Sequence, residues 1–288
     1  MKYINFSKSE QLEFMTKIKQ EINESWDSIA KKLEINRSMI FFYRNGHSKI
    51  SQINYEKLCK LANIKESINL KFIEINNKKN TIKIPKLTET LSEFIGSLAG
   101  DGHINNINYE VSISMDKNVD SDYSNHTQLL FKKLFNLKAK KHTQKNSTKC
   151  YVYSKELVEF LSEKYKIPIG KKKEKLKIPL KIKKNNLLLK AYIRGVFDTD
   201  GSFHRHRPKD AMLGISSRDE SFLNEIEESL KKLKFPTYRK LKDVYIYNKK
   251  EIDRFFKEIK PSNRKHTKKY NFYLKNGFVP LHKDILKR

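Results

Sequence analysis

The sequence is poor in cysteine, glycine and proline, and these shortages exclude several classes of protein. Its 288 residues include two cysteines, Cys59 and Cys150, nine glycines and seven prolines. Two isolated cysteines without a C-x-x-C partner indicate neither a disulfide framework nor a zinc site. No run of 18 apolar residues suggests a membrane helix, and residues 1–10 lack the apolar core of a secretion signal. We expect a cytoplasmic protein without a membrane partner, associated with the nucleoid in a prokaryote.

Positive charge is what the chain has in excess. Lys and Arg number 61 against 33 Asp and Glu, which gives a formal net charge of +28. A surface this basic exceeds what solubility requires and predicts a polyanionic partner. Nucleic acid is the leading candidate, because a basic surface that neutralises phosphates releases their counterions, which favours binding. A basic membrane-surface protein and the lysine bias of an AT-rich genome are the alternatives.

The N-terminal part of the chain is predicted to be a small all-α domain. Apolar spacing indicates short helices between residues 9 and 64, with few strand signals. The polar run at residues 76–80, followed by Pro85, indicates a linker. We therefore expect a domain over residues 1–75, a linker over residues 76–85 and a new domain from residue 86.

Residues 26–45 carry the spacing of a helix-turn-helix. Ala30 takes the small-residue position, and apolar residues take the expected buried positions: Ile29, Leu33, Ile35, Ile40 and Tyr43. The segment resembles the phage-repressor type, whose second helix enters the major groove of DNA. The resemblance implies that the start of this helix reads base edges, through Asn36, Arg37, Ser38 and Met39. Glu34 replaces the usual turn glycine. A helical bundle without DNA contact is the alternative.

From residue 86 the chain repeats itself, which reveals its architecture. Residues 151–155 (YVYSK) and 245–249 (YIYNK) share an alternating strand pattern, and each runs into an amphipathic helix. Upstream, each copy has a predicted hairpin, at 109–115 and 203–216, followed by a helix. Each half is therefore predicted to be helix, hairpin, helix, hairpin, helix. We expect an α+β fold with halves at residues 86–185 and 186–288.

Each half opens with a glycine-bearing apolar helix that ends in an acid and a glycine. Residues 94–102 (FIGSLAGDG) and 193–201 (IRGVFDTDG) hold five of the nine glycines. A glycine within a helix costs about 1 kcal/mol relative to alanine, so we expect these two helices to pack backbone to backbone. Gly102 and Gly201 are predicted to end the helices in the left-handed conformation, which brings the preceding acids to one point.

Two carboxylates at two helix C-termini concentrate negative charge, because the last carbonyl groups of a helix carry a partial negative charge. Mg²⁺, or Mn²⁺, fits such a site, since it takes oxygen ligands and commonly binds through one or two carboxylates. We expect the ion on Asp101 and Asp200, with the terminal carbonyl groups of Gly100 and Thr199 as further ligands. For one motif alone, a capped core helix with a solvated aspartate is the simpler interpretation.

These paired segments resemble the signature of the LAGLIDADG homing endonuclease family, over about residues 86–286. The first motif departs from the second in having Ala99 where the second has Asp198. The resemblance implies two pseudo-symmetric αββαββα repeats in one chain, whose strands form a saddle in the DNA major groove. It also implies that metal-activated water hydrolyses double-stranded DNA, as in intron homing.

The resemblance further implies an outer lysine that assists through hydrogen-bonded water. We predict Lys175 in the basic run at residues 170–179 and Lys268 in the second half, with Lys265 and Lys269 as alternatives there. Polar strand residues would face DNA if the saddle forms: Ser112, Ser114, His204, Arg205, His206, Arg239 and Lys240. Taken singly, each is also expected as a solvated position on a half-buried sheet.

Three functions suit this basic scaffold: a DNA endonuclease, a DNA-binding regulator without catalysis, and an RNA maturase that grips intron RNA. Retention of Asp101 and Asp200 favours the endonuclease. Because the two halves differ in sequence, we expect a monomer that reads a long asymmetric site. The chain begins with Met1 and lacks the C-terminal residues of protein splicing, which predicts a freestanding gene rather than an intein.

Overall fold

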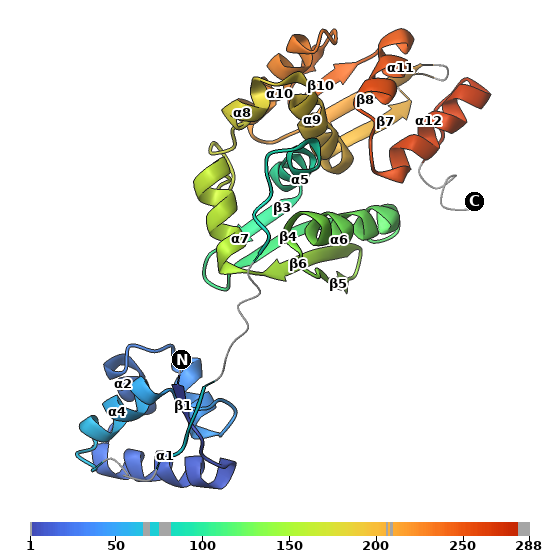
Figure 1. Ribbon diagram of the computed structural model, residues 1–288. Coiled ribbons are helices and arrows are strands. Elements are labelled where there is room, and N and C mark those ends of the chain that lie inside the picture. The colour runs from blue at the N-terminus through green and yellow to red at the C-terminus, as the bar shows by residue number, and fades with distance from the viewer. Residues whose placement is uncertain (1, 66–69, 75–81, 206, 208–209, 282–288) are drawn as a thin grey trace. The chain divides into compact units, whose positions relative to one another are not determined.

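The chain forms two compact units, Met1–Lys79 and Asn80–Arg288 (Figure 1). The computed structural model describes residues 2–65, 70–74, 82–205, 207 and 210–281. No helix in these described ranges is long and apolar enough to cross a membrane. The predicted linker at residues 76–85 falls largely outside the described residues.

The first unit holds the predicted helices and, in addition, a small sheet that the sequence did not indicate. Each helix begins after a Ser or Asn whose side chain accepts a backbone hydrogen bond, at Ser7, Ser25, Asn36 and Ser51. The helices are α1 (Lys8–Ile22), α2 (Trp26–Lys32), α3 (Arg37–Arg44) and α4 (Gln52–Leu61). The antiparallel strands are β1 (Lys2–Ile4) and β2 (Phe72–Glu74). Strands of three residues are too short for an alternating pattern to reveal.

The first half of the second unit is an αββαββα repeat, as predicted. Its four strands form an antiparallel sheet in the order β3-β4-β6-β5. The elements are α5 (Glu89–Ala99), β3 (Gly102–Asn105), β4 (Glu110–Asp116), α6 (Ser121–Phe135), β5 (Lys140–Gln144), β6 (Ser147–Tyr153) and α7 (Lys155–Glu159). Helix α7 continues into a π-helical turn, η1 (Phe160–Lys164).

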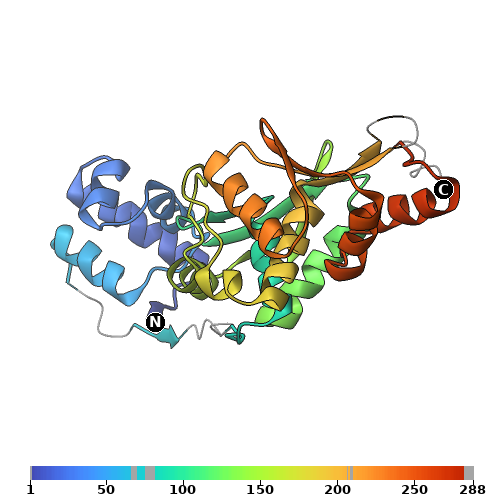
Figure 2. The same ribbon diagram turned by 90° about the horizontal axis from the view of Figure 1, so that it is seen from above.

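The second half repeats this order and adds a short helix before it and a longer helix after it. Its sheet has the equivalent order, β7-β8-β10-β9. The elements are α8 (Leu180–Lys183), α9 (Asn186–Asp200), β7 (Gly201–Arg205), β8 (Ala211–Ser216), α10 (Glu220–Lys232), β9 (Tyr238–Lys240), β10 (Asp243–Ile246), α11 (Lys249–Glu258) and α12 (Arg264–Asn276). Helix α12 lies beside β7 (Figure 2).

Helices α5 and α9 lie side by side in the middle of the second unit, with one sheet on either side of them (Figure 1). Apolar side chains from both helices and from the inner faces of both sheets form one continuous core. Leu91, Phe94 and Ile95 on α5 and Ile193, Val196 on α9 are fully buried. The ends of these two helices therefore meet at a fixed place between the two halves.

Candidate metal centre

The two motif helices approach each other closely, as the glycines predict. An added Cβ at Gly96 would lie 2.1 Å from the carbonyl oxygen of Tyr192, and one at Gly195 would lie 2.0 Å from the carbonyl oxygen of Glu93. At Gly100 the obstructing atom is the hydroxyl oxygen of Thr199, at 2.1 Å. Real Cβ atoms do not approach backbone oxygens at such distances, so only glycine lets α5 and α9 reach this separation.

The prediction that Gly102 and Gly201 adopt the left-handed conformation is wrong. Neither has a positive φ, and Gly201 is extended, with φ −87° and ψ 156°. Each residue instead begins a strand that turns back against its own helix. A Cβ would lie 2.4 Å from the Cα of Leu98 at Gly102 and 2.2 Å from the carbonyl oxygen of Phe197 at Gly201. Close packing, rather than backbone conformation, requires glycine here.

Asp101 and Asp200 come together at the C-terminal ends of α5 and α9. Asp200 Oδ2 lies 3.0 Å from the Cβ position of Gly100, the residue before Asp101. Burial, followed by repulsion from Asp101, raises the pKa of Asp200 to about 7. The pKa of Asp101 is also raised, first by loss of water around its carboxylate, although the residue as a whole is exposed. The two carboxylates form a shared negative centre.

Two lysines oppose this negative charge, and they are not the two that the sequence suggested. Lys172 and Lys265 both lower the pKa values of Asp101 and Asp200. Lys172 Nζ donates hydrogen bonds to the carbonyl oxygens at the end of α5, those of Leu98 (3.1 Å), Ala99 (3.0 Å) and Gly100. The ammonium group thus lies directly beside the carboxylate pair.

The two lysines predicted from the basic runs lie elsewhere. Lys175 is exposed. Lys268 is also exposed, and its Nζ lies 3.8 Å from an oxygen of Asp122. Spacing within a lysine-rich run does not determine which side chain points inward, so the sequence located the segments but not the residues. The geometry favours Lys172 and Lys265 for the predicted role.

Two further aspartates hold the lysine-bearing segments, and sequence reasoning missed both. Asp120 and Asp219 each lie 19 residues after a motif aspartate. Asp120 Oδ1 accepts hydrogen bonds from Asn263 Nδ2 (2.7 Å) and lies 3.0 Å from Lys265 Nζ. Asp219 Oδ2 accepts one from the backbone N–H of Glu174 (2.7 Å). The aspartate of each half therefore fixes the basic segment of the other half. The shared spacing was the available signal.

The residues at this centre fit a hard divalent cation. Two carboxylates lie beside backbone carbonyl groups, and repulsion between Asp101 and Asp200 favours binding of positive charge there. No cluster of three or more His, Cys, Asp or Glu side chains occurs among the described residues. Carboxylate and carbonyl oxygens are the ligand type that Mg²⁺ takes, commonly with one or two protein carboxylates. The Gly100 carbonyl oxygen accepts a hydrogen bond from Lys172 Nζ. Metal binding by the Gly100 and Thr199 carbonyl groups stays a prediction.

The predicted DNA-facing strand residues divide between the two faces of the sheets. Strand alternation places Ser114, His204 and Lys240 on the face opposite the core, with Ser112. Ser112 itself is only 2% exposed, because it pairs with His103 on one side and Tyr151 on the other. The larger neighbours, rather than Ser112, present surface to a partner.

Strand alternation places Arg205 and Arg239 on the helix-covered face of their sheet, and not on the polar face expected for them. Arg205 pairs with buried Ala211, and its guanidinium stacks over the ring of Phe278 at 5.5 Å. Arg239 pairs with buried Val244 and lies 3.9 Å from Glu227 on α10. Strand residues alternate, so the neighbour of a surface residue points inward. His206 lies outside the described residues.

Paired tyrosines lie on the polar face of both sheets, at equivalent positions. In the sequence these positions indicated the repeat, but no site was predicted there. The rings of Tyr151 and Tyr153 are 5.4 Å apart on β6, and those of Tyr245 and Tyr247 are 5.9 Å apart at β10 and just after it. Lys149 Nζ lies 5.1 Å from the Tyr151 ring. Each polar face thus combines aromatic rings with positive charge.

In the first unit the helix-turn-helix positions are placed as predicted. Ala30, Ile29, Leu33, Ile40 and Tyr43 are buried, and Ile35 is partly buried. Glu34 has a φ of +58°, so the turn adopts the left-handed conformation that a glycine would favour. This explains why the motif survives without the glycine.

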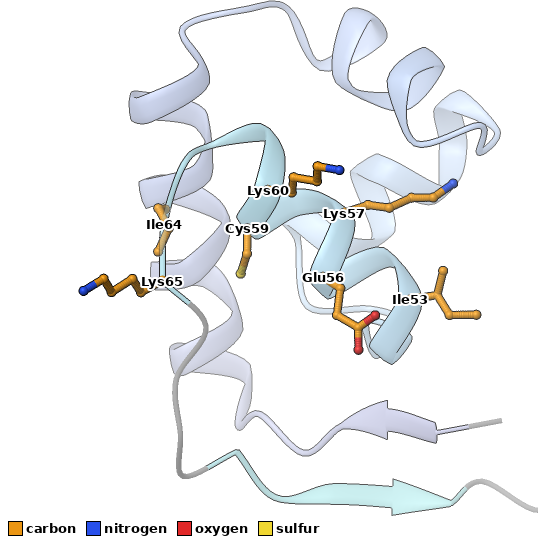
Figure 3. Close-up of a pocket in the computed structure, with 7 residues that line it drawn as sticks. All are labelled: Ile53, Glu56, Lys57, Cys59, Lys60, Ile64 and Lys65. Carbon is orange, nitrogen blue, oxygen red and sulfur yellow. The ribbon is translucent and has the colours of Figure 1, made fainter.

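The start of α3 is exposed. Asn36 caps the helix by accepting a hydrogen bond from the backbone of Ser38 (3.2 Å), and Arg37 Nε lies 2.8 Å from Asp27. A hollow of about 820 Å³ also occurs in this unit, along α4 and the turn after it, where Ile53 and Lys57 are among its lining residues (Figure 3). None of its lining residues belongs to α3.

Two protein-family models match the second unit. Residues 188–260 match the LAGLIDADG-like domain, and residues 90–164 match the WhiA LAGLIDADG-like domain. Among solved structures, the N-terminal LAGLIDADG domain of WhiA aligns with 65% of this chain and 94% of its own, at 17% identity and a TM-score of 0.44. The structure of I-DmoI in complex with DNA and Mn aligns with 60% of this chain and covers 97% of its own chain, at 18% identity and a TM-score of 0.43.

Two curated proteins of Methanocaldococcus jannaschii contain similar segments. The isomerizing glutamine–fructose-6-phosphate aminotransferase is 25% identical over 247 residues, which cover 78% of this chain and 22% of the relative. The replication factor C small subunit is 30% identical over 120 residues, which cover 41% of this chain and 6% of the relative. The chain spans only these small parts of both relatives, so their named activities do not transfer to it.

Proposed function

Since the chain is a LAGLIDADG-fold protein with two repeats, we propose that it is a site-specific, divalent-metal-dependent endonuclease of double-stranded DNA. The observation that carries the proposal is the meeting of Asp101 and Asp200 at the ends of α5 and α9, with Lys172 and Lys265 beside them. A scaffold that only bound DNA would gain nothing from two mutually repelling, partly buried carboxylates.

Each group at the centre has a proposed role. Asp101 and Asp200 hold the metal, with carbonyl oxygens at the helix ends as further ligands. Bound Mg²⁺ or Mn²⁺ would lower the pKa of a water molecule and stabilise charge on the phosphate. Lys172 and Lys265 offset the negative charge of the carboxylates, and each orients water or a phosphate oxygen of one DNA strand. Asp120 and Asp219 position the segments that carry these lysines.

The proposed partner is duplex DNA held on the polar faces of the two sheets. The faces present Ser114, His204 and Lys240 with the paired tyrosines, and the whole chain carries +28 charge. Because the two faces differ in sequence, a single chain would read an asymmetric site. The exposed start of α3, with Asn36, Arg37 and Ser38, would add a second major-groove contact.

The decisive test uses a randomised duplex-DNA library with Mg²⁺. We expect cutting at one long sequence by the wild type, and none by the Asp101→Asn, Asp200→Asn double variant, whose DNA affinity should stay within about twofold because the acids bind metal rather than DNA. Sequencing of both bound and cut DNA separates binding from cleavage. Cutting by the double variant would refute the assigned centre.

A second candidate function is a DNA-binding regulator that does not cut. The match of residues 90–164 to the WhiA LAGLIDADG-like domain favours it, as does the helix-turn-helix unit. Selective retention of a duplex by the wild type, without cleavage in Mg²⁺ or Mn²⁺, would establish this function. Retention of folded RNA in preference to duplex DNA would indicate a maturase instead.

A further inference from the structure

A cavity of about 790 Å³ lies in the second unit among segments of both halves, and the proposed nuclease does not use it. It is lined by Lys86 and Leu87 before α5, by Lys164 at the end of η1 and residues 165–166 after it, by residues in the range 177–183, and by Glu225 on α10. Its volume falls within the range of about 300–1,000 Å³ that is usual for small-molecule sites. The cavity therefore has room for a ligand that contacts both repeats.

The cavity is far more basic than the chain around it. Six of its twelve lining residues are lysines, whereas Lys and Arg together make up about a fifth of the sequence. Among the described residues only one of the six, Lys183, has an ion pair, with Glu225 (4.0 Å) and Glu228 (3.1 Å). The other five are Lys86, Lys164, Lys166, Lys177 and Lys181. All five are exposed and lack a carboxylate partner, so their charge would attract an anion into the cavity.

The floor of the cavity is apolar, and one polar group in it lacks a partner. Leu87, Tyr165, Ile178 and Pro179 contribute buried or half-buried surface. Tyr165 is 4% exposed, and its hydroxyl has no hydrogen-bond partner within the described part of the chain. A buried hydroxyl without a partner is costly, because folding has removed its water. The hydroxyl oxygen is closed off from solvent, so Tyr165 lines the cavity with its other atoms.

The backbone beside the cavity is also unusual. The π-helical turn η1 ends at Lys164, immediately before Tyr165. Such turns are rare and occur frequently at functional sites. Here the extra residue in the turn sets the direction in which Lys164 and Tyr165 leave the helix.

We propose that this cavity binds a nucleoside phosphate, with the base on the apolar floor beside Tyr165 and the phosphates among the lysines. Two kinds of molecule carry a flat heterocycle next to phosphate: a free nucleotide and the phosphorylated end of a nucleic-acid strand. The site contains no residue of the carboxylate pair, so the inference does not depend on the endonuclease proposal.

The test is calorimetric titration of the full chain with ATP, inorganic triphosphate and adenosine at about 0.15 M salt, where exposed charges are screened. We expect ATP to bind at least about tenfold more tightly than either part alone. The Lys177→Ala, Lys181→Ala double variant should lose most of this affinity. Its control is Lys173→Ala, Lys184→Ala, which removes the same charge from exposed positions that do not line the cavity.

Tyr165→Phe adds a second readout. It keeps the ring and removes only the buried, unpaired hydroxyl, so we expect ATP affinity to stay within about twofold while the melting temperature of the free protein stays the same or rises. Binding of a 5′-phosphorylated oligonucleotide that competes with ATP would assign the site to a strand end. ATP binding without such competition would assign it to a free nucleotide. Equal affinity for ATP and triphosphate, or equal loss in both lysine pairs, would overturn the proposal.

Discussion

Gly195 lies against Glu93 so closely that an added Cβ would stand 2.0 Å from the Glu93 carbonyl oxygen. The same contact occurs in the other repeat, where a Cβ added at Gly96 would lie 2.1 Å from the Tyr192 carbonyl oxygen. The two contacts relate α5 and α9 by the pseudo-symmetry of the repeats. They fix how the helices meet, and with it the position of the acids at their ends.

Substitution of Gly195 by alanine should destabilise the second unit by about 3 kcal/mol, because the obstructing atom is a backbone oxygen that cannot move aside. Denaturant unfolding followed by circular dichroism measures this loss. Thr90→Ala on α5, a half-buried position outside the helix contact, is the control and should change stability by less than about 1 kcal/mol. A neutral Gly195→Ala would mean that the helices are farther apart in solution.

Ionisation of Asp200 should lower the stability of the metal-free protein as pH rises from about 4 to 7. The folded state holds the Asp200 proton more tightly than the unfolded chain does, since its pKa is about 7 against an ordinary value of 3.8. Ionisation in this window therefore costs stability. Asp200→Asn removes that cost and should raise the unfolding free energy at pH 8 by about 2 kcal/mol, a value reduced for partial exposure.

Thermal melts of both proteins at pH 3.5 and pH 8 check this, and we expect the difference to vanish at the lower pH. Addition of Mg²⁺ at pH 8 should raise the melting temperature of the wild type and leave that of Asp200→Asn nearly unchanged. A wild type whose stability relative to Asp200→Asn does not fall between pH 3.5 and pH 8 would contradict the assigned burial of Asp200.

Each lysine beside the acids should serve mainly one DNA strand. Lys172→Met and Lys265→Met are each expected to slow cleavage of one strand by about 100-fold, so that nicked DNA accumulates. The exposed lysines Lys175 and Lys268 provide matched controls, and methionine there should leave double-strand cleavage within about threefold of wild type. Gel analysis of a supercoiled plasmid with the target site separates nicked from linear product. Equal loss with Lys175→Met would restore the prediction made from the sequence.

Adjacent basic residues on β9 should differ in their effect on DNA binding. Lys240 lies on the polar face, whereas Arg239 lies on the helix-covered face near Glu227. Lys240→Ala is expected to weaken DNA binding. It should also reduce the slope of log affinity against log salt concentration by the amount that corresponds to about one phosphate contact. Arg239→Ala should leave the slope unchanged. Fluorescence anisotropy across a salt series measures both, and the reverse result would place the opposite sheet face on DNA.

Glycine should improve the turn of the helix-turn-helix. Glu34 has a φ of +58°, which costs a non-glycine residue about 1 kcal/mol, while its exposed ion pair with Lys57 at 3.2 Å contributes less. Glu34→Gly is therefore expected to raise the stability of the first unit slightly, by roughly 0.5 kcal/mol. Hydrogen exchange of α2 and α3 amides within the full chain reports it. Faster exchange in the variant would show that the ion pair outweighs the strain.

The sequence by itself determined the repeat, the order of its elements and the pair of acids. These features depend on local periodicity and on residues such as Asp101 and Asp200 that recur at one spacing, and a repeated pattern reports them without knowledge of contacts. The same holds for the helix-turn-helix, whose buried positions follow from helical spacing around Ala30.

Only the tertiary structure decided which lysines approach the acids, which strand residues face outward and why Gly102 and Gly201 are glycines. Lys172 and Lys175 are the same residue type and lie three residues apart, so the sequence does not distinguish them. The hydrogen bond from the Glu174 backbone N–H to Asp219 fixes how this segment lies beside the acids. Side-chain direction depends on contacts between segments far apart in the sequence, such as that of Asp120 with Asn263, 143 residues later, and no local pattern carries that information.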